Sequence, residues 1–567
     1  MTSTKRPHVV LEDMAANSAP FRSTQRAPRS CIPCSTRKVK CDKSEPCLTC
    51  VRRGESASCI RETVLIRGEP KKWQESTGNP PQVEDLRREN EQLRDELRKP
   101  KSGQLSHSTP STPRGPRNSH SLENSDSIED ALWDSIRFKA VPSGSTIGSW
   151  EEAVLPSRSA SDHLIAYDRT WNCWVHYAVE YPQFQQECDA FMDALESGQA
   201  LESYDHHWKA VYFSVLCAAL LMMEEEEATC LVASEHVDMD VSSLCRNWYD
   251  AAIFSLHRAD FMRVPHIGTV QCIAVLGMCF NNLGDAELCR HMWNIALRIA
   301  QKLGLNTPRS EHAGSLGTEA QHRLWWTLTI CEWLGVPHEP TSLEEVDFEV
   351  PLPRPHVTTR NGGKTVVDPA HYHVFMARTS IVYNRFCQSL QRSPLSSENV
   401  VRAADEELAL VIDTLPDHLQ PELEAHGRIR EPELSEPWIK WQRFDITLVL
   451  LHHRIRINRT LQRHWLSSPG EFAWARTVCV QSALDIIWIS RNWDQPVSMR
   501  KQWALSFHLF VAAILLLREW QSSLDGRSLE YKEAIEAGLS ILEQVQSHNA
   551  IARHAVRILK ENMYVTF

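Results

Sequence analysis

From about residue 145 onward, apolar side chains recur at the three- and four-residue steps of an amphipathic helix. Between residues 289 and 303 this face comprises Trp293, Ala296, Leu297, Ala300 and Leu303. Gly304 follows, as is typical of a helix C-terminus that needs a positive φ. The same periodicity predicts further helices at His207–Met223, Ser243–Arg258, His322–Leu334, Tyr372–Leu390, Glu436–Leu461, Phe472–Arg491 and Trp503–Ser522. Because no clear alternating strand pattern interrupts them, residues 145–567 are expected to form a large all-α domain.

The two longest apolar runs are Val211–Met223 and Leu505–Leu517. Neither reaches the roughly 18 to 20 residues that cross a bilayer. The first is followed by Glu224–Glu227 and the second contains His508. We therefore interpret both as buried helices and expect no membrane partner. The first residues lack the apolar core of a signal peptide, so an intracellular protein is expected.

The N-terminal quarter of the chain has a different composition, rich in Ser, Pro, Arg and Cys. We divide it by composition into a disordered tail, a cysteine-rich module, a polar linker, a short charged helix ended by Pro100, and a disordered Ser/Pro-rich linker. These segments are residues 1–28, 29–62, 63–82, 83–99 and 100–144, respectively.

Residues 83–99 carry the alternating spacing of heptad a and d positions. The positions are Val83, Leu86, Asn90, Leu93 and Leu97. A polar residue at an a position fixes the register of a two-stranded coiled coil at some cost in stability. We therefore expect a homodimer formed through this helix. The alternative is a single solvated helix, because just over two heptads are marginally stable alone.

Charge separates the chain into a basic head and an acidic body. Residues 1–81 contain 15 Lys and Arg against 8 Asp and Glu, whereas the whole chain has a net charge of −11. A basic head on an acidic body suggests that only the head meets a polyanion. The alternative reading is a solvated basic tail.

Six of the 17 cysteines lie between Cys31 and Cys59. The others are scattered, mostly in apolar helical stretches where a free thiol behaves as a small hydrophobic group. So many dispersed thiols without a signal peptide indicate a reducing compartment. The clustered six are therefore interpreted as metal ligands before disulfides.

The cluster has the spacing Cys31-x2-Cys34-x6-Cys41-x5-Cys47-x2-Cys50-x8-Cys59. A structural Zn²⁺ takes four ligands in a tetrahedron. Six thiolates satisfy one zinc with two to spare, or two zincs if two thiolates bridge. So small a module has almost no apolar core, so metal binding must supply most of its folding free energy. The alternative is a metal-storage protein that does not bind DNA. Such a protein would be expected to contain more cysteines and would have no need of basic residues between them.

Basic residues follow each Cys-x2-Cys pair. Arg37, Lys38 and Lys40 are expected in the helix opened by Cys34, and Arg and Lys donate to guanine O6 and N7 in the major groove. Arg52 and Arg53 take the equivalent positions after Cys50 and would suit phosphates.

The segment CIPCSTRKVKCDKSEPCLTCVRRGESASC resembles the fungal Zn2Cys6 binuclear cluster transcription factors. It carries their six-cysteine order, a basic R-K-V-K-C-D segment and a proline before the fourth cysteine. The resemblance implies two Zn²⁺ bridged by Cys31 and Cys47. One zinc would add Cys34 and Cys41, and the other would add Cys50 and Cys59.

The same resemblance implies double-stranded DNA as the partner, a nuclear location, and a linker followed by a short dimerisation helix. It assigns contacts with CGG-type base triplets to Arg37 and Lys38, and a backbone contact to Lys40. The chain departs from the family at Ser35, where Arg or Lys is usual. One phosphate contact is therefore in doubt, but the metal site is not.

Further along, the chain resembles the middle homology region that accompanies such clusters. The matching elements are Ala296–Leu305, the Arg323–Trp326 run and Val336–Pro353, and the resemblance covers about Leu155 to Asp417. It implies an all-α regulatory domain open to a small-molecule effector. Trp325 and Trp326 are expected to pack in the core rather than to line a ligand site.

No catalytic constellation is found. Gly362–Thr365 resembles the end of a phosphate loop, but Thr358 stands where its first glycine is needed. The pairs His371/His373, His206/His207 and His452/His453 lack the i, i+4 spacing of a helical metal site. We therefore do not expect an enzyme.

The sequence predicts a zinc-dependent, dimeric regulator of transcription by RNA polymerase II that binds CGG-type half-sites and contacts coactivators or the general machinery. Control of a secondary-metabolite gene cluster is the pathway that the resemblance favours. The alternatives are a regulator of nutrient catabolism genes and a zinc-containing scaffold or corepressor.

Overall fold

The chain divides into two units, residues 1–118 and residues 119–567, and each is described by itself. The computed structural model describes residues 30–37, 39–42, 44, 46–60, 64–66, 69–71, 125–137, 147–235, 238–308, 316–335, 341, 343–355, 358–359, 365–392, 397–421, 436–493, 495, 497–522 and 526–564. The expected tail 1–28 and the dimerisation positions Val83, Leu86, Asn90, Leu93 and Leu97 lie outside these residues.

The first unit is built from short elements around the cysteines. Its helices are α1 (Ile32–Thr36) and α2 (Leu48–Val51), with a 3-10 turn at Ser56–Ser58. β1 (Val64–Ile66) and β2 (Glu69–Lys71) form an antiparallel hairpin. We expected only a polar linker at residues 63–82. The Val-Leu-Ile run of β1 favours an extended backbone. Pairing with β2 supplies hydrogen-bond partners for that backbone.

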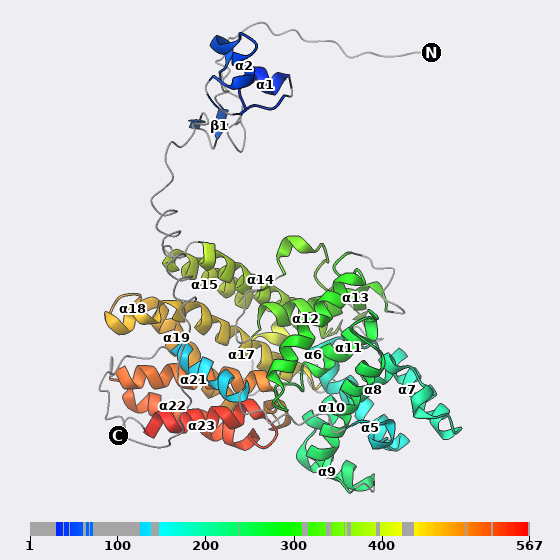
Figure 1. Cartoon of the computed structure of the whole chain (residues 1–567). Coiled ribbons are helices and arrows are strands. Elements are labelled where there is room, and N and C mark those ends of the chain that lie inside the picture. The colour runs from blue at the N-terminus through cyan, green and yellow to red at the C-terminus, as the bar shows by residue number, and fades with distance from the viewer. Residues whose placement is uncertain are drawn as a thin grey trace, which may run out of the picture. The chain divides into compact units, whose positions relative to one another are not determined.

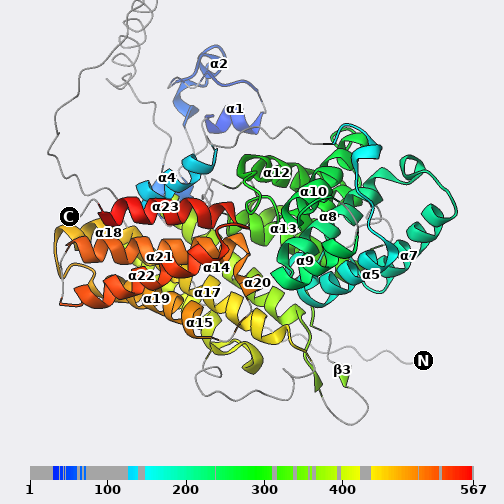
Figure 2. The ribbon, with the colours of Figure 1, turned by 90° about the horizontal axis from the view of Figure 1, so that it is seen from below.

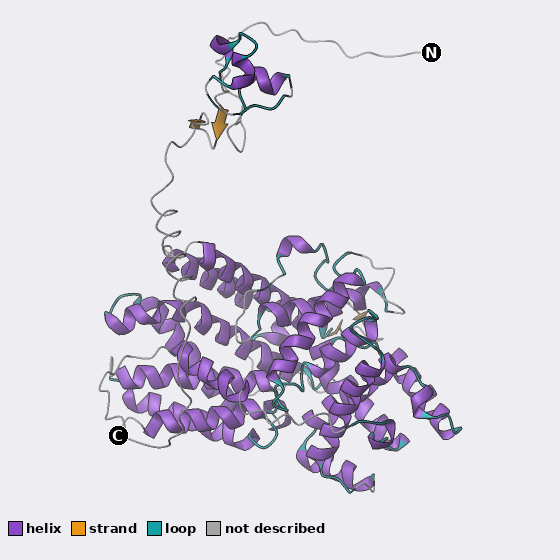
Figure 3. Cartoon of the chain, in the orientation of Figure 1, coloured by secondary structure: helices purple, strands orange, loops and turns teal. Residues whose placement is uncertain are grey.

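The second unit is helical throughout most of its described length (Figure 3). The expectation of an all-α domain is confirmed, with one small exception. The strands β3 (Thr358–Thr359) and β4 (Thr365–Val366) form a minimal antiparallel pair. The helices are α4 (Ser125–Arg137), α5 (Arg158–Tyr167), α6 (Cys173–His176), α7 (Gln183–Glu196), α8 (His206–Met222), α9 (Glu225–Ser234), α10 (Val241–Arg258), α11 (Ile267–Leu276), α12 (Ala286–Lys302), α13 (Thr318–Trp333), α14 (Ala370–Arg392), α15 (Ser397–Asp413), α17 (Ile439–Asn458), α18 (Gln462–Ser467), α19 (Ala473–Asn492), α20 (Val497–Arg500), α21 (Trp503–Ser522), α22 (Ser528–Val545) and α23 (Ala550–Tyr564).

These helices surround two hydrophobic cores. One is formed mainly by α5 to α13 and includes Trp248 and Trp325. The other is formed mainly by α14 to α23 and includes Trp465 and Tyr531. In Figure 1 the cyan and green helices of the first core lie to the right and the yellow to red helices of the second lie to the left. Across the boundary between the two cores, α13 packs on α14 and α12 contacts α4.

The eight helices predicted from periodicity are all present, with ends that differ by a few residues. Gly304 has the expected positive φ, 79°. It ends α12 with the Gly304 N–H bonded to the Gln301 carbonyl and the Leu305 N–H bonded to the Ala300 carbonyl, each at 3.0 Å. A residue with a Cβ would be strained at this φ.

Both apolar runs are buried helices, as predicted. Within the described residues, α21 is nevertheless the one helix long and apolar enough to pass for a membrane span, which differs from our expectation on length. Of its most apolar window, 78% is buried inside the helical unit. At its C-terminal end, buried Glu519 accepts hydrogen bonds from Trp465 and Arg476. Neighbouring helices therefore cover α21.

Helix α4 corrects the expectation that residues 100–144 are a disordered linker. Leu132, Trp133 and Ile136 lie on one face of α4 and are buried in the second core. Glu129 forms a two-pronged ion pair with Arg459, one contact being 2.9 Å long. α4 lies against α23 in Figure 2. Three buried apolar side chains among many polar ones are too few to predict this helix from periodicity, but tertiary packing stabilises it.

Buried histidines give the helical unit an expected sensitivity to acid. Burial lowers the pKa of His373 to about 3 and that of His453 to about 3. Burial also lowers the pKa values of His452 and His508 well below the ordinary value. In the unfolded chain these groups titrate near 6.5, so only the unfolded state gains protons as the pH falls below that value.

We therefore expect the free energy of unfolding to decrease as the pH falls from about 6.5 towards 4. Each buried histidine contributes up to about 1.4 kcal/mol per pH unit. Asp445 opposes this trend, because burial raises its pKa to about 6. Denaturant titrations of the full chain at pH 7.5, 6.5 and 5.5, followed by circular dichroism, measure the slope. His453→Gln should reduce this slope by the contribution of one histidine. His291→Gln, at an exposed position, should leave the slope unchanged. A stability that does not change over this range would contradict the prediction.

Candidate metal centre and nucleic-acid interface

The six cysteines of residues 31–59 form the buried centre of the first unit. Cys31 and Cys47 occupy equivalent places, each as the N-cap residue of a short helix, α1 or α2. Their backbones match closely, with φ/ψ of −65°/156° and −73°/147°. Cys34 and Cys50 lie inside the two helices and face the same centre. The chain thus repeats one local structure twice, as the two Cys-x2-Cys pairs predict.

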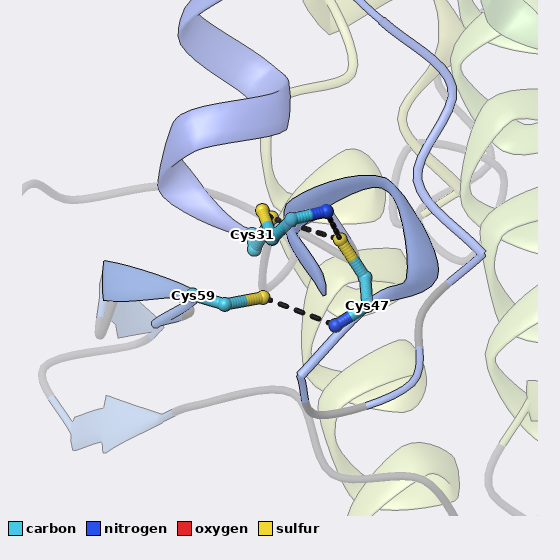
Figure 4. Close-up of side chains that lie close together, drawn as sticks. Cys31, Cys47 and Cys59 are labelled. Carbon is cyan, nitrogen blue, oxygen red and sulfur yellow. Dashed lines mark hydrogen bonds between the residues drawn. The ribbon is translucent and has the colours of Figure 1, made fainter. Parts of the chain in front are cut away.

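The sulfur atoms lie at the separations that tetrahedral zinc requires. Cys31 Sγ is 3.8 Å from Cys47 Sγ and 3.7 Å from Cys50 Sγ, and Cys34 Sγ is 3.6 Å from Cys47 Sγ. A tetrahedron with Zn–S bonds of about 2.3 Å has edges of about 3.8 Å. Figure 4 shows Cys31, Cys47 and Cys59 converging from three different segments of the chain.

Two groups of four sulfurs meet the geometric conditions for holding a metal ion. One group is Cys31, Cys34, Cys41 and Cys47, and the other is Cys31, Cys47, Cys50 and Cys59. Both groups contain Cys31 and Cys47. Among the described residues no third group of this kind occurs, including around the histidine pairs. These groups contain the same cysteines as the two ligand sets that the family resemblance implies, and the binding of one zinc ion by each set stays a prediction.

Electrostatics favour a cation at this centre. Burial raises the pKa values of Cys31 and Cys34, and it raises that of Cys50 to about 12. Cys47 differs. Burial alone would raise the pKa of Cys47. Hydrogen bonds, of which the largest contribution comes from the Cys50 backbone N–H, outweigh burial and lower the pKa of Cys47 to about 6. Several thiolates cannot be buried together unless a cation balances them, and zinc would deprotonate and balance them. The residues present fit zinc.

Hydrogen bonds hold the loops that carry the cysteines. The Asp42 carboxylate accepts from the Leu48 backbone N–H, at 3.1 and 3.2 Å, and from the Ser44 hydroxyl. The Thr49 hydroxyl donates to the Lys40 carbonyl at 3.1 Å, and the Ile32 N–H donates to the Ile60 carbonyl at 2.8 Å. With so small an apolar centre, these bonds and the metal must define the loop geometry.

The basic residues take more varied positions than predicted. α1 ends at Thr36, so Arg37 is its C-cap and Lys40 lies beyond the helix. The expectation of one helix containing both residues is wrong, because the chain must turn after Thr36 to bring Cys41 back to the metal centre. Lys40, Arg52 and Arg53 are exposed. Lys38 lies outside the described residues.

Arg37 has a partner that the sequence did not indicate. Its guanidinium donates to both oxygens of Glu55, at 2.5 Å each. Hydrogen bonding to Arg37 lowers the pKa of Glu55, so the pair is charged. The two residues are 18 positions apart, and only the fold of the cysteine loops brings them together. Glu55 fixes the guanidinium in one orientation at the surface.

The other candidate residues are structural. Trp325 and Trp326 are buried, as expected. Their rings pack on Phe348, with ring centroids 5.4 and 5.6 Å from the Phe348 centroid. His371 Nδ1 is hydrogen-bonded to the Asp368 backbone carbonyl. The His373 ring stacks on the Tyr177 ring, with centroids 4.4 Å apart. Gly362–Lys364 lie outside the described residues, and Thr365 begins β4.

A buried six-thiol centre with exposed basic residues, joined to a large helical unit, defines a zinc-cluster protein with a separate helical domain. Comparison with protein families agrees. Residues 29–65 match the fungal Zn(2)-Cys(6) binuclear cluster domain, and residues 167–358 match the fungal specific transcription factor domain. The chain thus carries matches to both domains that are described for fungal Zn(2)-Cys(6) transcription factors. These matches indicate a transcription factor, not an enzyme.

Individual relatives agree with this assignment. The chain is 20% identical to the agnestins biosynthesis cluster transcription factor AgnL11 of Paecilomyces divaricatus, over 95% of this chain and 85% of the relative. It is 35% identical to the Zn(2)-C6 fungal-type transcription factor pigI of Monascus ruber over 88 residues, which are 15% of this chain and 10% of that protein.

Among solved structures, a chain of the K. lactis CBF3 core has a similar fold, with a TM-score of 0.53. The match covers 78% of this chain and 90% of that chain. At 13% sequence identity, it shows a shared fold alone.

Proposed function

We propose that this transcription factor holds two zinc ions and uses the metal centre to present basic side chains to CGG-type DNA half-sites. Cys31 and Cys47 would bridge the two ions. Cys34 and Cys41 would complete one tetrahedron, and Cys50 and Cys59 the other. The observation that carries this proposal is the pair of overlapping four-sulfur groups that share two cysteines. Zinc supplies charge balance and fixes the loops, whereas the chemistry of recognition belongs to the side chains.

Base contacts would come from Arg37 and Lys38, and phosphate contacts from Lys40, Arg52 and Arg53. Arg37 supports this assignment because its guanidinium is exposed and oriented by Glu55. A planar, oriented guanidinium suits the O6 and N7 atoms of guanine. The exposed residues Arg52 and Arg53 follow α2 closely and suit the backbone, where contacts position the protein without reading sequence.

The protein would act in the nucleus as a homodimer formed through Val83, Leu86, Asn90, Leu93 and Leu97. Dimerisation would place two clusters on two half-sites, with residues 63–82 setting their separation. The helical unit would regulate activity and contact coactivators or the general transcription machinery.

A secondary-metabolite gene cluster is the proposed target. The similarity to a factor named for the agnestins biosynthesis cluster supports this choice. Genome-wide occupancy mapping in the source fungus tests it. Binding concentrated at the promoters of one biosynthetic gene cluster is expected, whereas binding mainly at nutrient-catabolism genes would contradict it.

Selection from a random duplex pool tests DNA recognition. The zinc-loaded full chain should enrich duplexes containing CGG triplets. Lys38→Ala should retain zinc but lose discrimination by roughly 1–3 kcal/mol for each lost base contact. Lys302→Ala is the matched control, because Lys302 is an exposed lysine at the end of α12 in the helical unit. It should change neither the zinc content nor the CGG preference. A pool without an enriched motif, or an unchanged preference after Lys38→Ala, would contradict the proposal.

A further inference from the structure

A cavity of about 370 Å³ lies inside the helical unit, where its two hydrophobic cores meet. Ala274 and Ile330 in its wall belong to the first core. Trp133 and Tyr372 in its wall belong to the second. Its volume falls in the range of small-molecule sites, which are mostly apolar with a few placed polar groups. The cavity is therefore large enough for a ligand that touches both cores.

One of those polar groups is a buried acid without a cationic partner. Asp445 of α17 is 5% exposed and lines the cavity. One of its carboxylate oxygens accepts a hydrogen bond from the Tyr372 hydroxyl of α14. Within the described part of the chain, no Lys, Arg or His forms an ion pair with it. Arg443, two residues earlier on α17, donates to the His418 carbonyl at 2.9 Å.

The rest of the wall does not supply the missing positive charge. His373 is buried, and burial lowers its pKa to about 3, so its ring is neutral. Arg290 of α12 is paired with Glu287 at 2.7 Å. Glu332 of α13 adds a second carboxylate to the wall, hydrogen-bonded by the Thr341 hydroxyl at 2.8 Å. His176, also in the wall, is paired with Asp168 at 3.2 Å. The two carboxylates of Asp445 and Glu332 therefore have no cationic partner in the wall.

Aromatic rings form much of the remaining wall. Trp293 of α12, Trp503 of α21 and Trp133 of α4 all line the cavity. Indole faces attract cations by their quadrupole and pack against flat apolar bodies. An unpaired buried carboxylate is costly unless a partner compensates it. The wall therefore complements a ligand that carries a positive charge on an apolar body.

We infer that this cavity binds a small organic cation with an aromatic body, whose ammonium group pairs with Asp445. The aromatic body lies among Trp133, Trp293 and Trp503. Because the ligand contacts residues of both hydrophobic cores, it stabilises their packing against each other. This site is separate from the zinc cluster and does not depend on the proposed DNA recognition.

Isothermal titration calorimetry of the zinc-loaded full chain tests the inference with three probes of one shape. The probes are protonated 2-naphthylmethylamine, neutral 2-naphthalenemethanol and anionic 2-naphthoate. The ammonium probe should bind at one site per chain, with a Kd about tenfold or more below that of the alcohol. Naphthoate should give no binding heat at the same concentrations, because it would face Asp445 across an apolar cavity.

Variants assign the binding to this cavity. Asp445→Asn keeps the side-chain shape and an acceptor for Tyr372, and it should bring the ammonium and alcohol affinities to within about threefold of each other. Asp485→Asn is the matched control. Asp485 is a half-buried acid of α19 that lies outside the cavity and whose pKa is also raised by burial. This control should keep the full preference. Ala504→Phe, which fills the cavity from the start of α21, should weaken both probes. It keeps the test informative if Asp445→Asn fails to fold.

Three results would overturn the inference. They are no binding of the ammonium probe, equal binding of the ammonium and alcohol probes to the unaltered chain, and an ammonium preference that survives Asp445→Asn. Zinc chelation separates this inference from the proposed function, because it should remove DNA binding and leave the ammonium probe bound.

Discussion

Removal of zinc from the purified chain should abolish its DNA binding and leave the helical unit folded. The six sulfurs are the buried centre of the first unit, and Val39 is the one other hydrophobic residue packed against them in its described part. Without the metal, the free energy that holds these loops is lost. Chelation or Cys34→Ser should lower affinity for a CGG duplex by about a hundredfold or more, to the non-specific level. Gel-shift titration measures affinity, and circular dichroism reports the helices.

Metal analysis by mass spectrometry should give two zinc ions per chain before chelation. Cys230→Ser is the matched control, because Cys230 is an exposed cysteine of the helical unit and its loss should change neither zinc content nor affinity. A chain that binds its duplex equally well after chelation, or that holds a single zinc at saturation, would refute the two-zinc account.

The second large effect concerns the buried ion pair between α19 and α21. Glu519 has a fully buried side chain that accepts from Arg476 Nε at 2.7 Å and from Trp465 Nε1 at 2.9 Å. Arg476→Leu leaves this carboxylate buried without a cation. Breaking one partner of such a pair costs about 3–5 kcal/mol. Denaturant unfolding followed by circular dichroism should show this decrease in the free energy of unfolding.

Two further variants separate the pair from general damage. Arg158→Leu removes an arginine whose partners, Asp193 and Glu196, are exposed, so it should cost at most about 1 kcal/mol. Adding Glu519→Gln to Arg476→Leu should recover part of the loss, because the amide is neutral and still accepts from Trp465. A loss for Arg476→Leu no larger than that for Arg158→Leu would contradict a stabilising role of Arg476 beside the buried Glu519 carboxylate.

The all-α fold of the large unit could be predicted where helices bury a wide face. α21 begins and ends at the predicted residues, and α12 and α8 lie within a few residues of their predictions. α4 could not be predicted in this way. Its few buried side chains lie in a polar segment, and packing on the second core, together with the Glu129–Arg459 pair, stabilises it.

The buried cluster of six thiols was predictable because its cysteines are marked by residue type and spacing alone. In a Cys-x2-Cys pair, local backbone geometry alone brings two sulfurs close enough to bind one metal ion. Cys31, Cys34, Cys47 and Cys50 could therefore be recognised without knowledge of the tertiary structure. The surface around it was less predictable. Glu55 holds Arg37 across 18 residues, and nothing in the local sequence marks an ion pair between segments joined only by the loops.

The sequence by itself determined the cluster of six cysteines, the helical class of the large unit and most of its helices. Those features depend on local spacing and on side-chain periodicity, which neighbouring residues along the chain set. The tertiary structure alone decided the partner of Arg37, the docking of α4 and the acid-lined cavity between the two cores. The reason is that each of these arises where side chains far apart in sequence meet, and there the balance of buried charge depends on which groups the fold brings into contact.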